Sequence, residues 1–402
     1  MSSQLNPIPS NEFERLISLS DFDLDYSNLN DNFKDLTELA ARVSDSEISV
    51  VNLIDSYTTW SISSFGLDNV SQTPREESTC QYTIMGKDFF EVENLTLDDR
   101  LRDKAFVFPP LSLRYYFGLP LSTADGSNIG ALCVLDRNTR KLSPEKIELL
   151  RLIANEIVNR LNTIKVVKEL KNRLTDSKQN NMKIAHDIRG PLSGIIGIAE
   201  VISERGDKNQ LNDILDLINM IQKSGKSLLT LADEILTTDY QKSTALSNDE
   251  FNLTVLQEKL DVLYRPQARN KDIHFTVEIS STNHKIPFAK NKLLQIAGNL
   301  ISNAIKFTPV SGTVSVDLGL KMDSDGKNLI IGVSDSGPGL NAEAIHMILY
   351  GEKNSSSGSN GEQGYGFGLL MVKHLIDGLQ GKLEIDSDGQ KGTQFKVILP
   401  IT

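Results

Sequence analysis

Cysteine and tryptophan are scarce in this chain of 402 residues, which has two cysteines and one tryptophan. Cys80 and Cys133 are too few and too far apart in the sequence for a disulfide framework or a zinc site, so we expect two buried thiols in a reducing compartment. The sequence also lacks a run of about 18 apolar residues that would span a bilayer, and its N-terminus lacks a basic flank followed by an apolar core. We therefore expect a cytoplasmic protein without membrane insertion.

Clusters of basic residues are missing as well. The chain has 42 Lys and Arg against 53 Asp and Glu, which gives a formal net charge of -11. Binding to a phosphate backbone needs clustered cations, so nucleic acid is not an expected partner. The length and a hydrophobic content of 39% are sufficient for two or three domains with their own cores.

The first part of the chain predicts a tail followed by a mixed domain. Residues 1–28 are polar and acidic with two early prolines, which is typical of a tail. An amphipathic helix and the β-branched run "EISVVNLIDSYTTW" follow, and two apolar runs flank the turn residues Ala124-Asp125-Gly126. We predict an α+β domain that ends near residue 140, with Trp60 packed in its core; a place in a pocket wall is the alternative for Trp60.

A long helix is predicted to begin where this domain ends. Ser143 is placed as N-cap and Pro144 at the first helical position. The apolar residues that follow alternate in steps of three and four, which predicts a coiled-coil seam between two chains over 143–180. These residues are Ile147, Leu150, Ala154, Ile157, Leu161 and Ile164. Beyond Ile164 the stripe shifts by one residue, so two separate helices packed on their own domains remain an alternative.

The helical pattern reaches about Arg205, pauses, and resumes from Leu211 to about Tyr240. This predicts an antiparallel hairpin over 175–242, with so small a core that a second copy should complete a four-helix bundle. The stretch "AHDIRGPL" lies in its first helix and contains His186, Asp187 and Pro191. Because proline removes one backbone hydrogen bond, we expect a bend just below the histidine.

Residues 250–402 mix helices with β-rich segments and contain four motifs in a fixed order. "NLISNAIKFT" places Asn299 and Asn303 one helical turn apart, with Lys306 three residues further on. Amide oxygens are neutral, hard ligands of the kind that Mg²⁺ accepts. Two exposed polar residues on a helix would produce the same pattern, so this motif alone decides little.

The other three motifs are rich in glycine. "DSGPGL" places Asp335 next to two glycines, "GYGFGLLMVKHLI" places three alternate glycines at the start of a helix, and "GQKGTQF" precedes the last strand. Glycines let a backbone approach a ligand, and the free N–H groups at a helix start favour phosphate oxygens. Each motif alone is more often a simple turn.

In this order the four motifs resemble the N, G1, G2 and G3 boxes of the ATP-binding domain of sensor histidine kinases, and "AHDIRGPL" resembles their H box. "TPREESTCQYTI" and "RYYFGLPLSTADGSNIGALCVLD" resemble a GAF sensory domain, which would extend over 29–160. The resemblance implies a multidomain α+β chain: a GAF α/β sensor, a coiled coil and helical hairpin that form a four-helix bundle in the dimer, and a C-terminal Bergerat-fold α/β sandwich.

The resemblance also implies the chemistry. ATP with Mg²⁺ would phosphorylate His186 while Asp187 accepts its proton, and the group would pass to an aspartate in the receiver domain of a separate response regulator. In a homodimer of this kind, Asn303 would bind Mg²⁺ with Asn299 beside it, Lys306 would contact phosphate, and Asp335 would accept from the adenine amino group. The remaining nucleotide contacts implied are Gly337, Gly339, Gly364, Gly366, Gly368, Leu369 and Thr393.

Two departures from the family pattern limit the expected activities. Gly190 stands where many relatives carry a Thr or Asn that positions water, so phosphatase activity by that route is not expected. Neither cysteine is followed by the histidine that accompanies a bilin-attaching cysteine, so we expect no chromophore or haem and leave the GAF signal, a small molecule or a protein, open. The alternatives are an ATP-binding scaffold with little or no kinase activity and an ATPase of the gyrase kind.

Overall fold

The chain is seen here in a computed structural model. It describes residues 7–67, 72–205, 216–226, 228–229, 250–281, 283–289, 292–323, 326–350, 367–387, 389 and 391–401, with the backbone alone at 28, 172, 175–187, 205, 250, 323 and 350. By its internal contacts the chain divides into two compact units. The first comprises Met1–Val166 and Glu250–Thr402, and the second comprises Val167–Asp249.

The first unit contains a six-stranded antiparallel sheet in the order β3-β2-β1-β6-β5-β4. Its strands are β1 (Ile48–Ile54), β2 (Thr58–Phe65), β3 (Gln72–Pro74), β4 (Phe90–Val92), β5 (Tyr115–Ser122) and β6 (Asn128–Asp136). Every residue of β1 is buried, in agreement with its β-branched run. The predicted hairpin turn is confirmed, with Gly126 at a φ of +83° between β5 and β6.

Helices cover both faces of this sheet. Helix α2 (Asn30–Ser44) packs on one face and the short α3 (Cys80–Thr83) on the other. Successive side chains of a strand point to opposite faces. Accordingly Val51 and Leu53 enter the larger hydrophobic core, while Val50 and Ile54 enter a second one. Three short 3₁₀ helices complete the domain: η1 (Tyr26–Asn28), η2 (Arg75–Glu77) and η3 (Ala105–Val107).

The stretch predicted as a tail contains a packed helix, α1 (Glu12–Ser20), so that prediction is wrong for these residues. Leu16 and Leu19 are buried in the larger core. The acidic composition was misleading because the carboxylate of Glu12 is itself buried, where it pairs with Arg15 at 2.8 Å and Arg75 at 2.5 Å. The polar residues of this stretch therefore form part of the folded domain.

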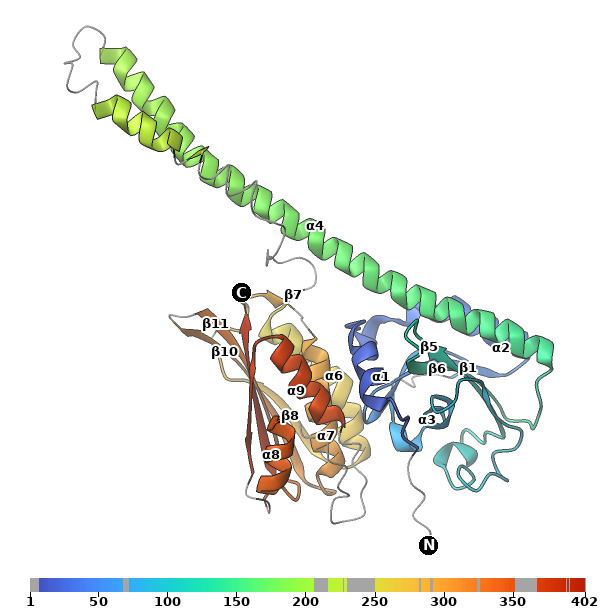
Figure 1. The fold of residues 1–402 in the computed structure, drawn as a ribbon. Helices are drawn as coiled ribbons and strands as arrows, with labels where there is room; N and C mark the ends of the chain where they lie inside the picture. The colour runs from blue at the N-terminus through green and yellow to red at the C-terminus, as the bar shows by residue number, and fades with distance from the viewer. Residues whose placement is uncertain are drawn as a thin grey trace. The chain divides into compact units, whose positions relative to one another are not determined.

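Helix α4 (Pro144–Arg205) is one continuous helix of 62 residues, so the alternative of two separate helices does not hold (Figure 1). Its predicted start is confirmed, since the amide of Lys146 donates to Ser143 Oγ at 3.4 Å. The predicted seam is wrong in its first part, because Leu150, Ala154, Ile157 and Leu161 are buried in the core of the first unit. They are therefore not available to a second chain.

The second unit consists of the remainder of α4, with Pro191 inside it, and a helical segment at 216–226. The predicted turn at 205–210 lies almost wholly outside the described residues. Over the ranges that the structure describes, no helix combines the length and apolarity needed to cross a membrane.

A second sheet has the order β12-β13-β11-β10-β8, with β8 and β10 parallel and the other pairs antiparallel. Its strands are β8 (His274–Ile279), β10 (Thr313–Asp323), β11 (Gly326–Asp335), β12 (Lys382–Asp386) and β13 (Thr393–Ile401); β7 (Glu250–Phe251) pairs separately with β9 (Phe288–Ala289). Helices α6 (Leu253–Asn270), α7 (Leu293–Phe307) and α9 (Phe367–Gly378) pack on one face of it, and α8 (Ala342–Tyr350) contacts α9 (Figure 1). The predicted mixed α/β class is confirmed.

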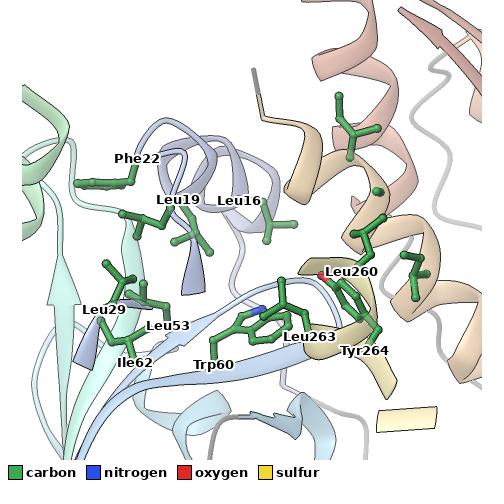
Figure 2. Close-up of a cluster of buried hydrophobic side chains, with 14 of the residues drawn as sticks. Leu16, Leu19, Phe22, Leu29, Leu53, Trp60, Ile62, Leu260, Leu263 and Tyr264 are labelled. Atoms are coloured by element: carbon green, nitrogen blue, oxygen red, sulfur yellow. The ribbon is translucent and has the colours of Figure 1, made fainter. Parts of the chain in front are cut away.

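Within the first unit the larger hydrophobic core is shared by elements of both sheets. Trp60 of β2 is stacked on Tyr26, with ring centroids 4.9 Å apart. It meets the ring of Tyr264 of α6 edge-on at 5.7 Å (Figure 2). The core role predicted for Trp60 is confirmed. The same cluster contains Leu16 of α1 and Leu260 of α6, so α1 contributes to it as well.

Candidate functional site

Helix α7 carries the two predicted metal-binding amides on one buried face. Asn299 and Asn303 are 2% and 7% exposed. Asn299 Nδ2 donates to the carbonyl of Gln295 at 2.9 Å, but the Oδ1 atoms of both asparagines have no hydrogen-bond partner within the described part of the chain. A buried polar atom without a partner costs about 1–3 kcal/mol. Two such oxygens one turn apart therefore indicate a place for a cation or an N–H donor.

Lys306 ends the same helix and faces aromatic and acidic neighbours. Its Nζ lies 5.1 Å from the ring centroid of Tyr57 and 4.0 Å from Oε2 of Glu76. The side chain is half-buried. An ammonium group that is partly withdrawn from water interacts with an anion more strongly than one on an open surface, which suits the predicted contact with phosphate.

Asp335 ends strand β11, directly opposite Thr393 at the start of β13. Its carboxylate accepts a hydrogen bond from the amide of Gly337 at 2.7 Å, and the amide of Thr393 also donates to it. Burial raises the pKa of Asp335 above its ordinary value of 3.8, and the two amides oppose that rise without cancelling it. The result is a fixed, half-buried acceptor at the end of the sheet.

Glycines hold the backbone close around this carboxylate. Gly339 has a φ of +80° and Gly392 a φ of +87°, a region that favours glycine. A Cβ on Gly392 would lie 2.0 Å from the carbonyl oxygen of Asp335, and one on Gly337 would lie 2.8 Å from its carboxylate. Gly392 was not predicted as a site residue. Its signal in the sequence is the Gly-Thr pair of "GQKGTQF".

The third glycine motif is only partly described. Gly364 and Gly366 lie outside the described residues, whereas Gly368 and Leu369 occupy the first turn of α9. Leu369 is half-buried and packs against the hydrophobic core. A Cβ on Gly368 would lie 3.1 Å from Ser56 Oγ. Ser56, in the turn between β1 and β2, therefore lies close to the start of α9.

The turn between β1 and β2 lies against both helices of the candidate site. Besides the approach of Ser56 to α9, the hydroxyl of Thr58 is 3.4 Å from the hydroxyl of Ser302 on α7. A cavity of about 240 Å³ remains beside Tyr57 and Lys306. Pockets that enclose a small-molecule ligand have volumes of about 300–1,000 Å³. This cavity is smaller than such pockets, and of the predicted nucleotide contacts its lining includes Lys306 but not Asn303 or Asp335.

The candidate phosphate acceptor belongs to the other unit. His186 and Asp187 lie within α4, and their side chains are outside the described part. Gly190 follows in the same helix with no atom within 4 Å of a Cβ built on it. The structure therefore brings together the residues of α7, β11, β13 and α9, and leaves His186 to a separate body of the chain.

The chain has four other histidines, His274, His284, His346 and His374. His274 lies in strand β8 but is exposed, and His346 and His374 lie on helices with exposed side chains. His284 lies in a loop and is half-buried. None of the four is in the core.

Three family models match the chain. Residues 289–402 match "Histidine kinase-, DNA gyrase B-, and HSP90-like ATPase", residues 179–240 match "His Kinase A (phospho-acceptor) domain", and residues 28–161 match "GAF domain". The first of these models implies that the C-terminal domain uses ATP.

Among the curated relatives, the autoinducer 2 sensor kinase/phosphatase LuxQ of Vibrio harveyi is 30% identical over 227 residues, which cover 54% of this chain and 26% of LuxQ. Sensor protein GacS of Pseudomonas syringae pv. syringae is 32% identical over 230 residues, covering 54% of this chain and 24% of GacS. The chain thus spans about a quarter of the length of these relatives. A solved structure of histidine kinase ThkA with the response regulator protein TrrA matches at 21% identity and a TM-score of 0.30, covering 72% of this chain and 75% of that one.

Proposed function

We propose that this chain, which matches the GAF, His Kinase A and histidine kinase-like ATPase models, is a sensor histidine kinase. In this proposal ATP phosphorylates His186, and the group then passes to an aspartate of a separate response regulator. The observation that carries this proposal is the nucleotide site itself. A half-buried acceptor, Asp335, occurs in the domain whose family uses ATP. The same domain contains the amide oxygens of Asn299 and Asn303, which have no hydrogen-bond partner among the described residues.

The nucleotide contacts follow from the chemistry of each group. Asp335 is a fixed carboxylate and would accept from the exocyclic amino group of adenine. Gly337, Gly339 and Thr393 would form the wall around the base, because their backbone already encloses that carboxylate. The N–H groups at the start of α9 and the ammonium of Lys306 would bind phosphate oxygens.

The amides of α7 fit a magnesium ion. Their Oδ1 atoms are buried and without a hydrogen-bond donor among the described residues, and an amide oxygen is a ligand that Mg²⁺ accepts. Asn303 would be the main ligand and Asn299 its neighbour. When bound, Mg²⁺ neutralises charge on the phosphate oxygens.

His186 would act as the nucleophile. A solvent-exposed imidazole has a pKa of about 6.5 and is largely neutral at neutral pH, so one ring nitrogen has a free lone pair. That nitrogen attacks the γ-phosphorus, the bond to the bridging oxygen breaks, and ADP leaves. Asp187, the next residue, would accept the proton that the ring loses.

The β1–β2 turn supports control of this reaction by the GAF domain. Ser56 and Tyr57 of this turn, and Thr58 at the start of β2, lie against α9 and α7. They lie next to Gly368 and Lys306, which are proposed to contact the nucleotide. A signal that shifts this turn would open the site. Tyr57→Ala should then raise the affinity for ATP. Phe65→Ala, which changes an exposed side chain at the end of β2, is the control and should leave the affinity unchanged. Equal ATP affinities in the two variants would contradict this role of the turn.

Exposed apolar side chains of α4 support a homodimer. Leu170 and Leu174 are 58% and 57% exposed, and Ile188, Leu192 and Ile196 of the same helix are also exposed. A run of such residues indicates a surface that a second copy covers, as a four-helix bundle would. The pairing would begin beyond Leu161, because the residues before it are already buried in the first unit.

Calorimetric titration with ATP tests the nucleotide site. We expect binding that Mg²⁺ strengthens, a loss of that strengthening in Asn303→Ala, and no change in Asn159→Ala, which removes an exposed asparagine of α4. Identical Mg²⁺ dependence in Asn303→Ala and wild type would contradict the assignment. ATP binding without phosphorylation of the protein would favour the scaffold, and release of free phosphate alone would favour an ATPase of the gyrase kind.

A further inference from the structure

The two cysteines of the chain lie side by side inside the GAF domain. Cys80 begins α3 and Cys133 lies in β6, 53 residues away, yet their Sγ atoms are 3.1 Å apart. Their exposures are 3% and 1%. They belong to the second hydrophobic core, between the sheet and α3. This juxtaposition is not required by the nucleotide site or by phosphoryl transfer.

Polar groups surround the sulfur atoms in this otherwise apolar core. Asn52 Nδ2 donates to Cys80 Sγ at 3.1 Å. The hydroxyl of Tyr116 is 3.5 Å from Cys80 Sγ and 3.2 Å from Cys133 Sγ, and it is 2.7 Å from the hydroxyl of Thr83. Cysteines that only fill a core behave as small hydrophobic residues and need no such partners. Donors directed at sulfur stabilise a thiolate, which is the reactive form.

The two thiols are not equivalent. The hydrogen bond from the Cys133 thiol is the largest influence on Cys80 and lowers its pKa, with help from Tyr116, although burial acts in the opposite direction. Burial raises the pKa of Cys133. We assign the ionisation to Cys80, the sulfur that Asn52 Nδ2 contacts at 3.1 Å, with Cys133 as the thiol that then donates to it. This is the arrangement of a nucleophilic cysteine beside a second cysteine that can resolve its oxidised form.

We propose that Cys80 and Cys133 form a redox-active dithiol that hydrogen peroxide converts to an intramolecular disulfide. The sulfur of Cys80 attacks one peroxide oxygen, the O–O bond breaks, and the departing hydroxide takes up the proton that Cys80 released on ionising. Cys80 is then a sulfenic acid. The sulfur of Cys133 attacks it, the S–O bond breaks, and a second water leaves with the proton of Cys133. Two thiols and one peroxide give one disulfide and two waters.

Little movement is needed for the second step. The sulfur atoms must close from 3.1 Å to about 2.05 Å, the length of a disulfide bond. The new bond would join α3 to β6, the strand that leads into α4. Thiol oxidation at this site does not depend on the kinase activity proposed above, so either can fail without the other.

Counting thiols in the full chain tests the proposal directly, because there are no other cysteines to confuse the result. After treatment with hydrogen peroxide, unfolding and alkylation, we expect the two titratable thiols to be lost, a monomer on a non-reducing gel, and recovery of both thiols with dithiothreitol. If both thiols of the protein are still alkylated after a peroxide dose that oxidises free cysteine, the proposal is wrong. Disulfide bonds that form only between chains would also overturn it.

Variants separate the roles of the two sulfurs. Cys133→Ser should leave a sulfenic acid at Cys80 that dimedone traps, whereas Cys80→Ser should give no trapped product at Cys133. Tyr116→Phe should oxidise several-fold more slowly than wild type. Tyr115→Phe is the matched control, because its hydroxyl bonds to Glu91 rather than to sulfur. Equal trapping at both cysteines, or equal rates for the two tyrosine variants, would contradict the assigned roles.

Discussion

The buried ion cluster of α1 allows a quantitative prediction about the first domain. Glu12, Arg15 and Arg75 have fully buried side chains, and both guanidinium groups hydrogen-bond to the one carboxylate. Arg15 also donates to the carbonyl of Ile54 at 2.6 Å and Arg75 to that of Asp55 at 3.3 Å. The cluster therefore ties α1 to the β1–β2 turn.

Replacing Glu12 with Ala removes the carboxylate that hydrogen-bonds to both buried guanidinium groups. Breaking a buried pair in this way costs about 3–5 kcal/mol. For a domain of this size, about 1 kcal/mol lowers the melting temperature by about 2–4 °C, so we expect a fall of about 6–20 °C. Glu14→Ala removes an exposed acid from the same helix and should change the free energy of unfolding by less than about 0.5 kcal/mol.

Urea denaturation followed by tryptophan fluorescence provides the assay, since Trp60 is the only tryptophan and lies in the core that α1 covers. Burial opposes ionisation of Glu12, but Arg15 and Arg75 outweigh it and its pKa is lowered from 4.5. An acid with a lowered pKa stabilises the fold above its ordinary pKa and loses that contribution as the pH falls. The difference between wild type and Glu12→Ala should therefore shrink below pH 4.5. A difference under about 1 kcal/mol at neutral pH would refute the reasoning.

Three further predictions concern the nucleotide domain and α4. Burial raises the pKa of Asp335, so the carboxylate should become protonated, and ATP affinity should fall, as the pH drops toward this raised pKa. Asp335→Asn should bind ATP weakly at every pH. Titration calorimetry measures both affinities. Gly392→Ala should destabilise the fold more than Gly126→Ala. Both glycines have a positive φ, but only a Cβ at position 392 would collide with backbone, at the carbonyl oxygen of Asp335. Equal melting temperatures of the two variants would contradict this prediction. Ser143→Ala should cost about 1 kcal/mol in urea denaturation through loss of the α4 cap, and no change would exclude a capping role.

The elements that sequence reasoning located correctly are those with a local signal. The β-branched run of β1, the Ala124-Asp125-Gly126 turn and the Ser143 cap each depend on neighbours in sequence, and all three are present. Gly337 and Gly339 were singled out for the same reason, whereas Gly392 was not. Their close approach to Asp335 is visible only in the structure, because strands β11 and β13 are far apart in the chain.

The features that sequence reasoning missed depend on contacts between distant residues. Glu12 meets Arg75 across 63 positions, so an acidic stretch that reads as a tail is a packed helix. The apolar stripe of α4 was assigned to a second chain, whereas its first part meets the GAF core, because periodicity identifies a buried face but not its partner. The pairing of Cys80 with Cys133 is hidden in the same way.

Labelling with γ-labelled ATP and Mg²⁺ tests the central proposal most directly. We predict label on the wild-type protein that is labile in acid and stable in base, as phosphohistidine is. His186→Gln should carry none, while His374→Gln, which changes an exposed histidine of α9, should be labelled like the wild type. Label that persists in His186→Gln, or wild-type protein that binds ATP and takes up no label, would contradict the account.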